Sequence, residues 1–131
     1  MSFWQAKTKI RREDKLFSDY IRARDGWRCS YKFKCMGVYN FLENKGGLTN
    51  SHFIKRRHES VRFDPENCDA ACRPCHSFVE DKTEGRRALE NWKLTQLGTA
   101  RFNALRARKY AYKKKDPMLD LLYVKELLKT L

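Results

Sequence analysis

The chain has 131 residues, of which 29 are Lys or Arg and 16 are Asp or Glu, so its formal net charge is +13. This length indicates a single domain with a modest core and excludes a barrel enzyme. The charge favours a polyanionic partner such as DNA, RNA or anionic lipid. No apolar run is long enough to span a bilayer, so no membrane-spanning segment is expected.

The N-terminal segment, residues 1–26, is expected to form a helix over residues 5–24. Apolar side chains recur one helical turn apart in its LFSDYI stretch, and Asp25-Gly26 is a stop signal. The opening MSFWQAKTKIRRED has no apolar segment of the signal-peptide type. We therefore expect a cytoplasmic protein with reduced thiols.

Two short strands are predicted next, GVYNFLEN over 37–44 and GGLTNSHFI over 46–54, around a Lys45-Gly46-Gly47 turn. A basic loop, KRRHESVRFDPEN, then leads to a short strand at 67–71. A short helix follows at 74–81, because a proline is tolerated in the first helical turn.

Residues 84–131 are predicted to form a basic helical extension. One helix covers 86–97 and stops at Gly98, and the next starts at Thr99. The last begins with Asp116 as N-cap and Pro117 in its first turn. Between residues 82 and 115 there are eleven basic and two acidic residues, which favours contact with nucleic acid over a solvated helical surface.

The five cysteines indicate metal ligands more readily than disulfides in a reducing compartment. Cys29-x5-Cys35 and Cys72-x2-Cys75 form two pairs that suit a closed tetrahedral zinc site. Such an ion would be structural, because four thiolates leave no open position for catalysis, and it would stabilise a small domain.

Cys68 is left over from this set. It is expected to be a small buried side chain. The alternative is that Cys68-x3-Cys72-x2-Cys75 holds an iron–sulfur cluster, as in radical-SAM enzymes. Those enzymes need a much larger scaffold than this chain provides.

His52, Asn67 and His76 follow one another across the predicted strand, loop, strand and helix. This order resembles the HNH nuclease motif, in residues 29 to about 83. The resemblance implies an α+β fold with a small ββα-metal core over 27–83, stapled by the four-cysteine zinc site. The N-terminal helix and the basic C-terminal extension would flank this core.

The resemblance also implies the roles of these side chains. His52 would be the general base that takes a proton from water, and Asn67 would orient the segment that carries it. His76 would hold a catalytic Mg²⁺ or Mn²⁺ beside the scissile phosphate. Many HNH proteins have a second ligand just before the base, where this chain has Ser51. Glu80 is the other candidate ligand, with Asn50 and Asp69 as further substitutes.

A closer resemblance covers nearly the whole chain. The stretches KLFSDYIRARDGWRC, GLTNSHFIKRR and VRFDPENCDAACRPCHSF resemble the NinG (Rap) recombination endonucleases of lambdoid phages. The resemblance implies cleavage of branched DNA such as Holliday junctions or D-loops, leaving 5′-phosphate and 3′-hydroxyl ends, in a host cytoplasm. Symmetric cutting of two strands would need a homodimer, for which the helix DPMLDLLYVKELLKTL is a candidate interface. The other possibility for this helix is packing on its own domain.

Basic side chains are expected to contact phosphates and so to position the DNA without reading its sequence. They are Lys55, Arg56, Arg57, Arg62, Arg86, Arg87, Arg101, Arg106, Arg108 and Lys109. Two other functions remain open from the residues alone. One is a non-catalytic, zinc-stapled DNA-binding module, which Ser51 favours, and the other is an RNA-binding protein with a zinc knuckle.

Overall fold

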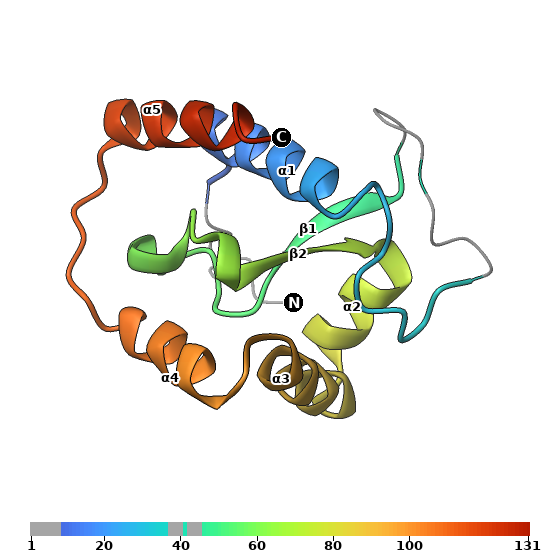
Figure 1. The fold of residues 1–131 in the computed structure, drawn as a ribbon. Helices are drawn as coiled ribbons and strands as arrows, with labels where there is room; N and C mark the ends of the chain where they lie inside the picture. The colour runs from blue at the N-terminus through green and yellow to red at the C-terminus, as the bar shows by residue number, and fades with distance from the viewer. Residues whose placement is uncertain (1–8, 37–40, 42–45) are drawn as a thin grey trace.

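The computed structural model describes residues 9–36, 41 and 46–131 (Figure 1). Its elements are α1 (Arg12–Arg24), β1 (Leu48–His52), η1 (Glu59–Val61), η2 (Pro65–Asn67), β2 (Cys68–Cys72), α2 (Arg73–Asp81), α3 (Thr83–Leu97), α4 (Thr99–Arg108) and α5 (Pro117–Leu128). The two strands form one small sheet and the remaining regular structure is helical. This mixed helix-and-sheet architecture agrees with the predicted α+β class.

The sheet pairs β1 with β2 in antiparallel fashion, with Leu48 opposite Cys72 and His52 opposite Cys68. The predicted strand at 37–44 lies outside the described residues, apart from Phe41, which is not in a strand. The partner of β1 is instead β2, Cys68–Cys72, which lies one residue later than the strand predicted at 67–71. A chain reversal through η1 and η2 brings it alongside β1.

Helix α1 begins at Arg12 rather than at residue 5: residues 9–11 are not helical, and residues 5–8 lie outside the described part. Two acidic side chains, Glu13 and Asp14, occupy its first turn, where they complement the helix dipole. The Asp14 carboxylate also accepts a hydrogen bond from the Arg11 backbone N–H at 2.7 Å. These interactions fix the start of the helix.

The core lies between two groups of helices, with α1 and α5 on one side of the sheet and α2, α3 and α4 on the other (Figure 1). Every residue of β2 is buried, and its small Ala70 and Ala71 allow the helices to approach closely. Helices α2 and α3 meet at Gly85, where a Cβ atom would lie 1.8 Å from the Phe78 carbonyl oxygen. Only glycine permits this tight crossing.

The C-terminal helix α5 starts where the sequence predicts, because the Asp116 carboxylate accepts a hydrogen bond from the Leu119 N–H at 3.1 Å. It packs against α1 and buries Val124 and Asp120. Within the described part of the chain, no helix is both long and apolar enough to cross a membrane.

Candidate functional site

Four cysteines come together beside the sheet. Cys29 and Cys35 lie on the loop after α1, Cys72 ends β2, and Cys75 is in the first turn of α2. Their sulfur atoms all lie within 4.8 Å of one another, with 3.7 Å between Cys35 and Cys72 and 3.8 Å between Cys35 and Cys75. Zn–S bonds of about 2.3 Å in a tetrahedron place the sulfurs about 3.8 Å apart. The cluster can therefore hold a metal such as zinc.

Thiols of the cluster have shifted pKa values. Burial and the neighbouring thiols raise the pKa of Cys35 to about 11. For Cys29, hydrogen bonds from the backbone of Cys72 and Lys32 outweigh the burial that raises its pKa, and the pKa is lowered. Metals bind the thiolate form, so a metal ion must displace the proton of Cys35, and its binding depends on pH.

Cys68 does not belong to this cluster. It begins β2, whereas Cys72 ends it, so about 13 Å of strand separates the two residues. Its side chain is fully buried, and burial raises its pKa well above the usual value. Cys68 is thus a buried structural residue, as predicted, and the three-cysteine iron–sulfur alternative is wrong.

The two predicted active-site histidines line one cleft of about 830 Å³. His52 reaches it from the end of β1 and His76 from α2. The other lining residues are Thr49, Asn50, Lys55, Arg56, Arg57, Arg73, Ser77, Glu80 and Asp81. With four basic and two acidic side chains in this lining, the cleft suits a phosphate-bearing ligand.

The tautomer of His76 follows from its contacts. The Thr49 hydroxyl donates to the Ala71 carbonyl at 2.7 Å, so it can only accept from His76 Nδ1, which lies 2.8 Å away. Nδ1 therefore carries a proton, and in the neutral form of the ring the lone pair is on Nε2. Such a contact orients imidazole ligands at metal sites. His76 is thereby prepared to bind a metal ion through Nε2.

A similar argument fixes the tautomer of His52. Its Nε2 lies 3.0 Å from the Arg62 carbonyl oxygen, which can only accept, so Nε2 is protonated and Nδ1 is the proton acceptor. Burial lowers the pKa of His52 to about 4, although the hydrogen bond to the carbonyl opposes this shift. The imidazole is therefore neutral at pH 7, which is the state required of a base.

Asn67 is fully buried and holds the segment that follows His52. Its side-chain Nδ2 donates to the carbonyls of Ile54 (2.9 Å) and Val61 (3.1 Å), and its Oδ1 accepts from the Ile54 N–H (2.8 Å). Its carbonyl also accepts from the Phe53 N–H at 2.8 Å. One asparagine thus fixes both ends of the turn that leaves β1.

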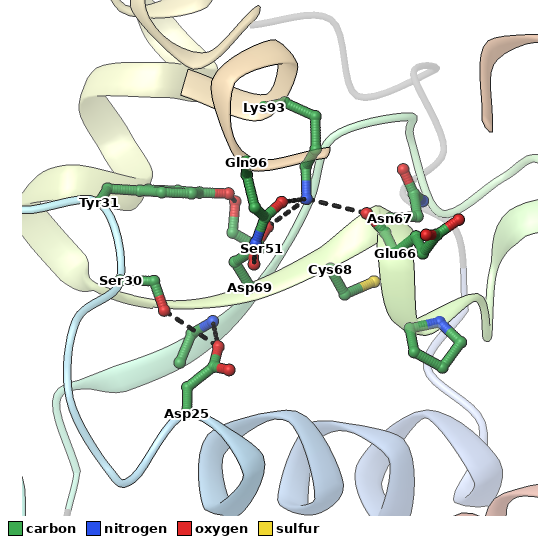
Figure 2. Close-up of polar contacts among 12 residues, drawn as sticks. Asp25, Ser30, Tyr31, Ser51, Glu66, Asn67, Cys68, Asp69, Lys93 and Gln96 are labelled. Atoms are coloured by element: carbon green, nitrogen blue, oxygen red, sulfur yellow. Dashed lines mark hydrogen bonds and ion pairs between the residues drawn. The ribbon is translucent and has the colours of Figure 1, made fainter. Parts of the chain in front are cut away.

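Ser51 and Asp69 are removed from the candidate metal ligands. They are paired across the sheet and both are buried, and neither lines the cleft (Figure 2). The Ser51 hydroxyl accepts from the Tyr31 hydroxyl at 2.9 Å, and the Asp69 carboxylate pairs with the fully buried Lys93. Side chains alternate along a strand, so Ser51 points away from the face that His52 uses.

Two oxygen ligands remain near His76. Glu80 Oε1 lies 3.7 Å from His76 Nε2, one helical turn along α2. Because His76 and Lys55 lie beside it, the pKa of Glu80 is lowered to about 2, so the carboxylate is ionised at neutral pH. Asn50 also lines the cleft, and its Oδ1 atom is buried without a hydrogen-bond partner among the described residues.

Eight of the ten predicted phosphate contacts divide into three groups by their position and exposure. Lys55, Arg56 and Arg57 line the cleft. Arg87, Arg101 and Arg106 are exposed, and Lys109 and Arg108 are half-buried. Arg101 and Arg108 are paired with Glu66, so their charge is partly neutralised.

Two of these ten predictions need correction. Arg62 is buried, and its guanidinium forms a two-fold ion pair with Asp14, so it cannot contact DNA. Arg86 is half-buried and turns inward, where it donates to the Phe53 carbonyl at 2.6 Å and lies over the Phe53 ring. Conversely, the exposed Arg73 lines the cleft but was not predicted. The sequence signal for this position was that Arg73 lies between Cys72 and Cys75, in the CRPC stretch just before His76.

Comparison with protein-family models, curated proteins and solved structures found no match. The cleft combines a neutral imidazole with a free proton acceptor, a second imidazole with a free lone pair, an ionised carboxylate and several cationic side chains. This set can bind a phosphodiester, hold a divalent cation beside it and accept a proton from water.

Proposed function

We propose that the chain is a metal-dependent DNA endonuclease of the HNH type. The observation that carries this proposal is the convergence of His52 and His76, each with its tautomer fixed by a neighbour, on one basic cleft. A lone histidine is weak evidence of catalysis. Two histidines with different free nitrogens in the same cleft support different roles, one as base and one as ligand.

His52 accepts the proton of the attacking water at Nδ1, while its Nε2–H stays on the Arg62 carbonyl. Asn67 positions this imidazole through the turn that follows β1. Arg57 and Arg73 hold the flanking phosphates, because both are exposed and line the cleft. These contacts place the phosphodiester without reading its sequence.

The catalytic cation would be held by His76 Nε2, the Glu80 carboxylate and the unpaired Asn50 Oδ1. This mixed nitrogen and oxygen set suits Mn²⁺ or Mg²⁺. When bound, the ion supplies positive charge that offsets the charge developing on the phosphate. Because Glu80 also pairs with Lys55, the ion and Lys55 compete for one carboxylate. The Asn50 oxygen, which has no other described partner, is the observation that supports the fit.

The ion of the four-cysteine cluster would be a structural Zn²⁺. It would join the loop after α1 to the end of β2 and the start of α2. Cys75 directly precedes His76, so this ion would also fix the turn of α2 that presents the catalytic ligand. Metal analysis should find one tightly held zinc per chain after dialysis against a weak chelator.

The preferred substrate would be branched recombination DNA, on the strength of the NinG-like stretches and the basic extension.

Cleavage of two strands would use a homodimer, with the exposed side of α5 as its interface: Met118, Leu119 and Leu122 are more than half exposed there. Sedimentation should show a dimer that Leu119→Asp with Leu122→Lys converts to a monomer. A monomeric wild-type chain would refute the interface without affecting the cleft.

The direct experiment is cleavage of a labelled four-way junction with Mg²⁺ and with Mn²⁺. His52→Ala and His76→Ala should each reduce the rate by at least a hundredfold. His58→Ala is the matched control, because His58 does not line the cleft, and it should cleave at the wild-type rate. If the wild-type chain binds the junction but leaves it intact with both ions, the nuclease proposal fails and a non-catalytic binding module remains.

A further inference from the structure

The segment that joins α4 to α5, residues 109–116, has no role in the proposed nuclease site. We call it the α4–α5 connector. It leaves α4 in a turn and then continues without regular structure to the N-cap of α5. Its sequence, KYAYKKKD, has two tyrosines flanked by lysines on both sides and contains four lysines and one acid. Figure 1 shows it as a long arc at the edge of the molecule.

The two tyrosines of the connector are unusually exposed. Tyr110 is 81% exposed and Tyr112 is 89% exposed, so neither ring contributes to the core. Large aromatic side chains are costly to leave in water, and a cluster of them on the surface marks an interaction site. Their Cα atoms can be no more than about 7 Å apart, because one residue separates them. One short ligand segment can therefore contact both rings.

The charge around these rings identifies the kind of ligand. The Lys109 ammonium lies 5.3 Å from the centre of the Tyr110 ring, and Lys114 and Lys115 follow Tyr112 in an exposed stretch. Lys113 pairs with Asp120, so it contributes less free charge than its neighbours. Aromatic rings flanked by cations suit a polyanion whose flat groups can stack, which is the chemistry of an unpaired nucleic-acid strand. A duplex hides the faces of its bases and offers only phosphates to such a segment.

The connector also contacts the chain shortly after the residues that line the cleft. The Lys109 carbonyl accepts a hydrogen bond from the Ser60 hydroxyl at 3.1 Å. Ser60 belongs to the same loop as Lys55, Arg56 and Arg57, which line the cleft. Two residues separate Arg57 from Ser60, so their Cα atoms can be no more than about 11 Å apart. A strand that leaves the cleft at this loop can therefore meet the connector.

We infer that the α4–α5 connector is a binding site for an unpaired nucleic-acid strand, whose bases stack on Tyr110 and Tyr112 while Lys109, Lys114 and Lys115 contact its phosphates. The site does not depend on cleavage, so it can be tested even if the chain proves to be no nuclease. It gives the chain a means of recognising an unpaired strand beside a duplex without reading its sequence.

The test is fluorescence anisotropy with the full-length, zinc-loaded chain and a labelled oligo(dT), without added Mg²⁺ or Mn²⁺. Tyr110→Ala and Tyr112→Ala should each weaken binding about tenfold, and Tyr110→Phe and Tyr112→Phe should stay within about twofold of wild type. Binding of a duplex of equal length should change less than twofold in all four variants. Because both rings are exposed, thermal unfolding should be unchanged.

Salt dependence separates stacking from charge. The tyrosine variants should retain the slope of log affinity against log salt concentration, whereas Lys114→Ala with Lys115→Ala should reduce it by about 1.4. A parallel oligo(rU) titration decides whether DNA or RNA is the preferred source of the strand. The inference is overturned if the alanine variants bind oligo(dT) as tightly as wild type, or if they lose duplex and single-strand binding equally.

Discussion

Replacing Asn67 by alanine is the sharpest test of how His52, the proposed base, is positioned. The side chain makes three hydrogen bonds of 2.8–3.1 Å, and all three partners are backbone groups of Ile54 and Val61. Asn67→Ala leaves one N–H and two carbonyl groups without these partners. Each lost bond costs about 1 kcal/mol, so we expect unfolding to become easier by about 3 kcal/mol.

Urea unfolding of the zinc-loaded chain, followed by tryptophan fluorescence, measures this loss. With a slope of about 2 kcal/mol/M, the midpoint should fall by about 1.5 M. Asn50→Ala is the matched control, because the Asn50 oxygen has no described hydrogen-bond partner, and its midpoint should stay within about 0.3 M of wild type. If Asn67→Ala changes the midpoint no more than Asn50→Ala does, the argument that Asn67 fixes the turn is refuted.

Three further outcomes are expected. The pKa of His52 is about 4 in the folded chain and about 6.5 when unfolded, so the unfolded chain takes up a proton first as the pH falls. The free energy of unfolding should therefore be about 3 kcal/mol lower at pH 4 than above pH 6.5 in urea titrations. His52→Gln should abolish this difference. Cys72→Ser with Cys75→Ser should abolish zinc retention and cooperative unfolding, whereas Cys68→Ser should leave the zinc content at wild-type level. Lys93→Met should cost about 3 kcal/mol, because it removes the buried ammonium that pairs with Asp69 and leaves this carboxylate only the Gln96 amide at 2.8 Å and the Arg24 guanidinium at 3.5 Å; adding Asp69→Asn should recover part of this loss, and additive losses would contradict the pairing.

Local signals in the sequence predicted much of the site. The spacing of the cysteine pairs placed four thiols together, and the order of His52, Asn67 and His76 placed both imidazoles on one cleft. Asp116 followed by proline gave the start of α5. These predictions succeeded because each depends on residues close together in the chain or on a motif with a fixed geometry.

Features that depend on distant partners were not predictable. Arg62 looked like one more cation of a basic loop, and only its pairing with Asp14, 48 residues earlier, removes it from the surface. Similarly, the pairing of β1 with β2 depends on a chain reversal of 15 residues that no local pattern specifies. Ser51 is an intermediate case. Alternation along the strand places it on the face opposite His52, once the strand itself is known.

The adjacency of Cys75 and His76 has a consequence for any study with chelators. A strong chelator would withdraw the cation proposed for the cleft and, more slowly, the ion proposed for the sulfur cluster, so inhibition by itself would have two causes. The order in which the ions are restored separates them. Mg²⁺ alone should rescue a briefly treated sample, whereas one left long enough to lose its zinc should need that metal first, because the helical turn that presents the imidazole must re-form.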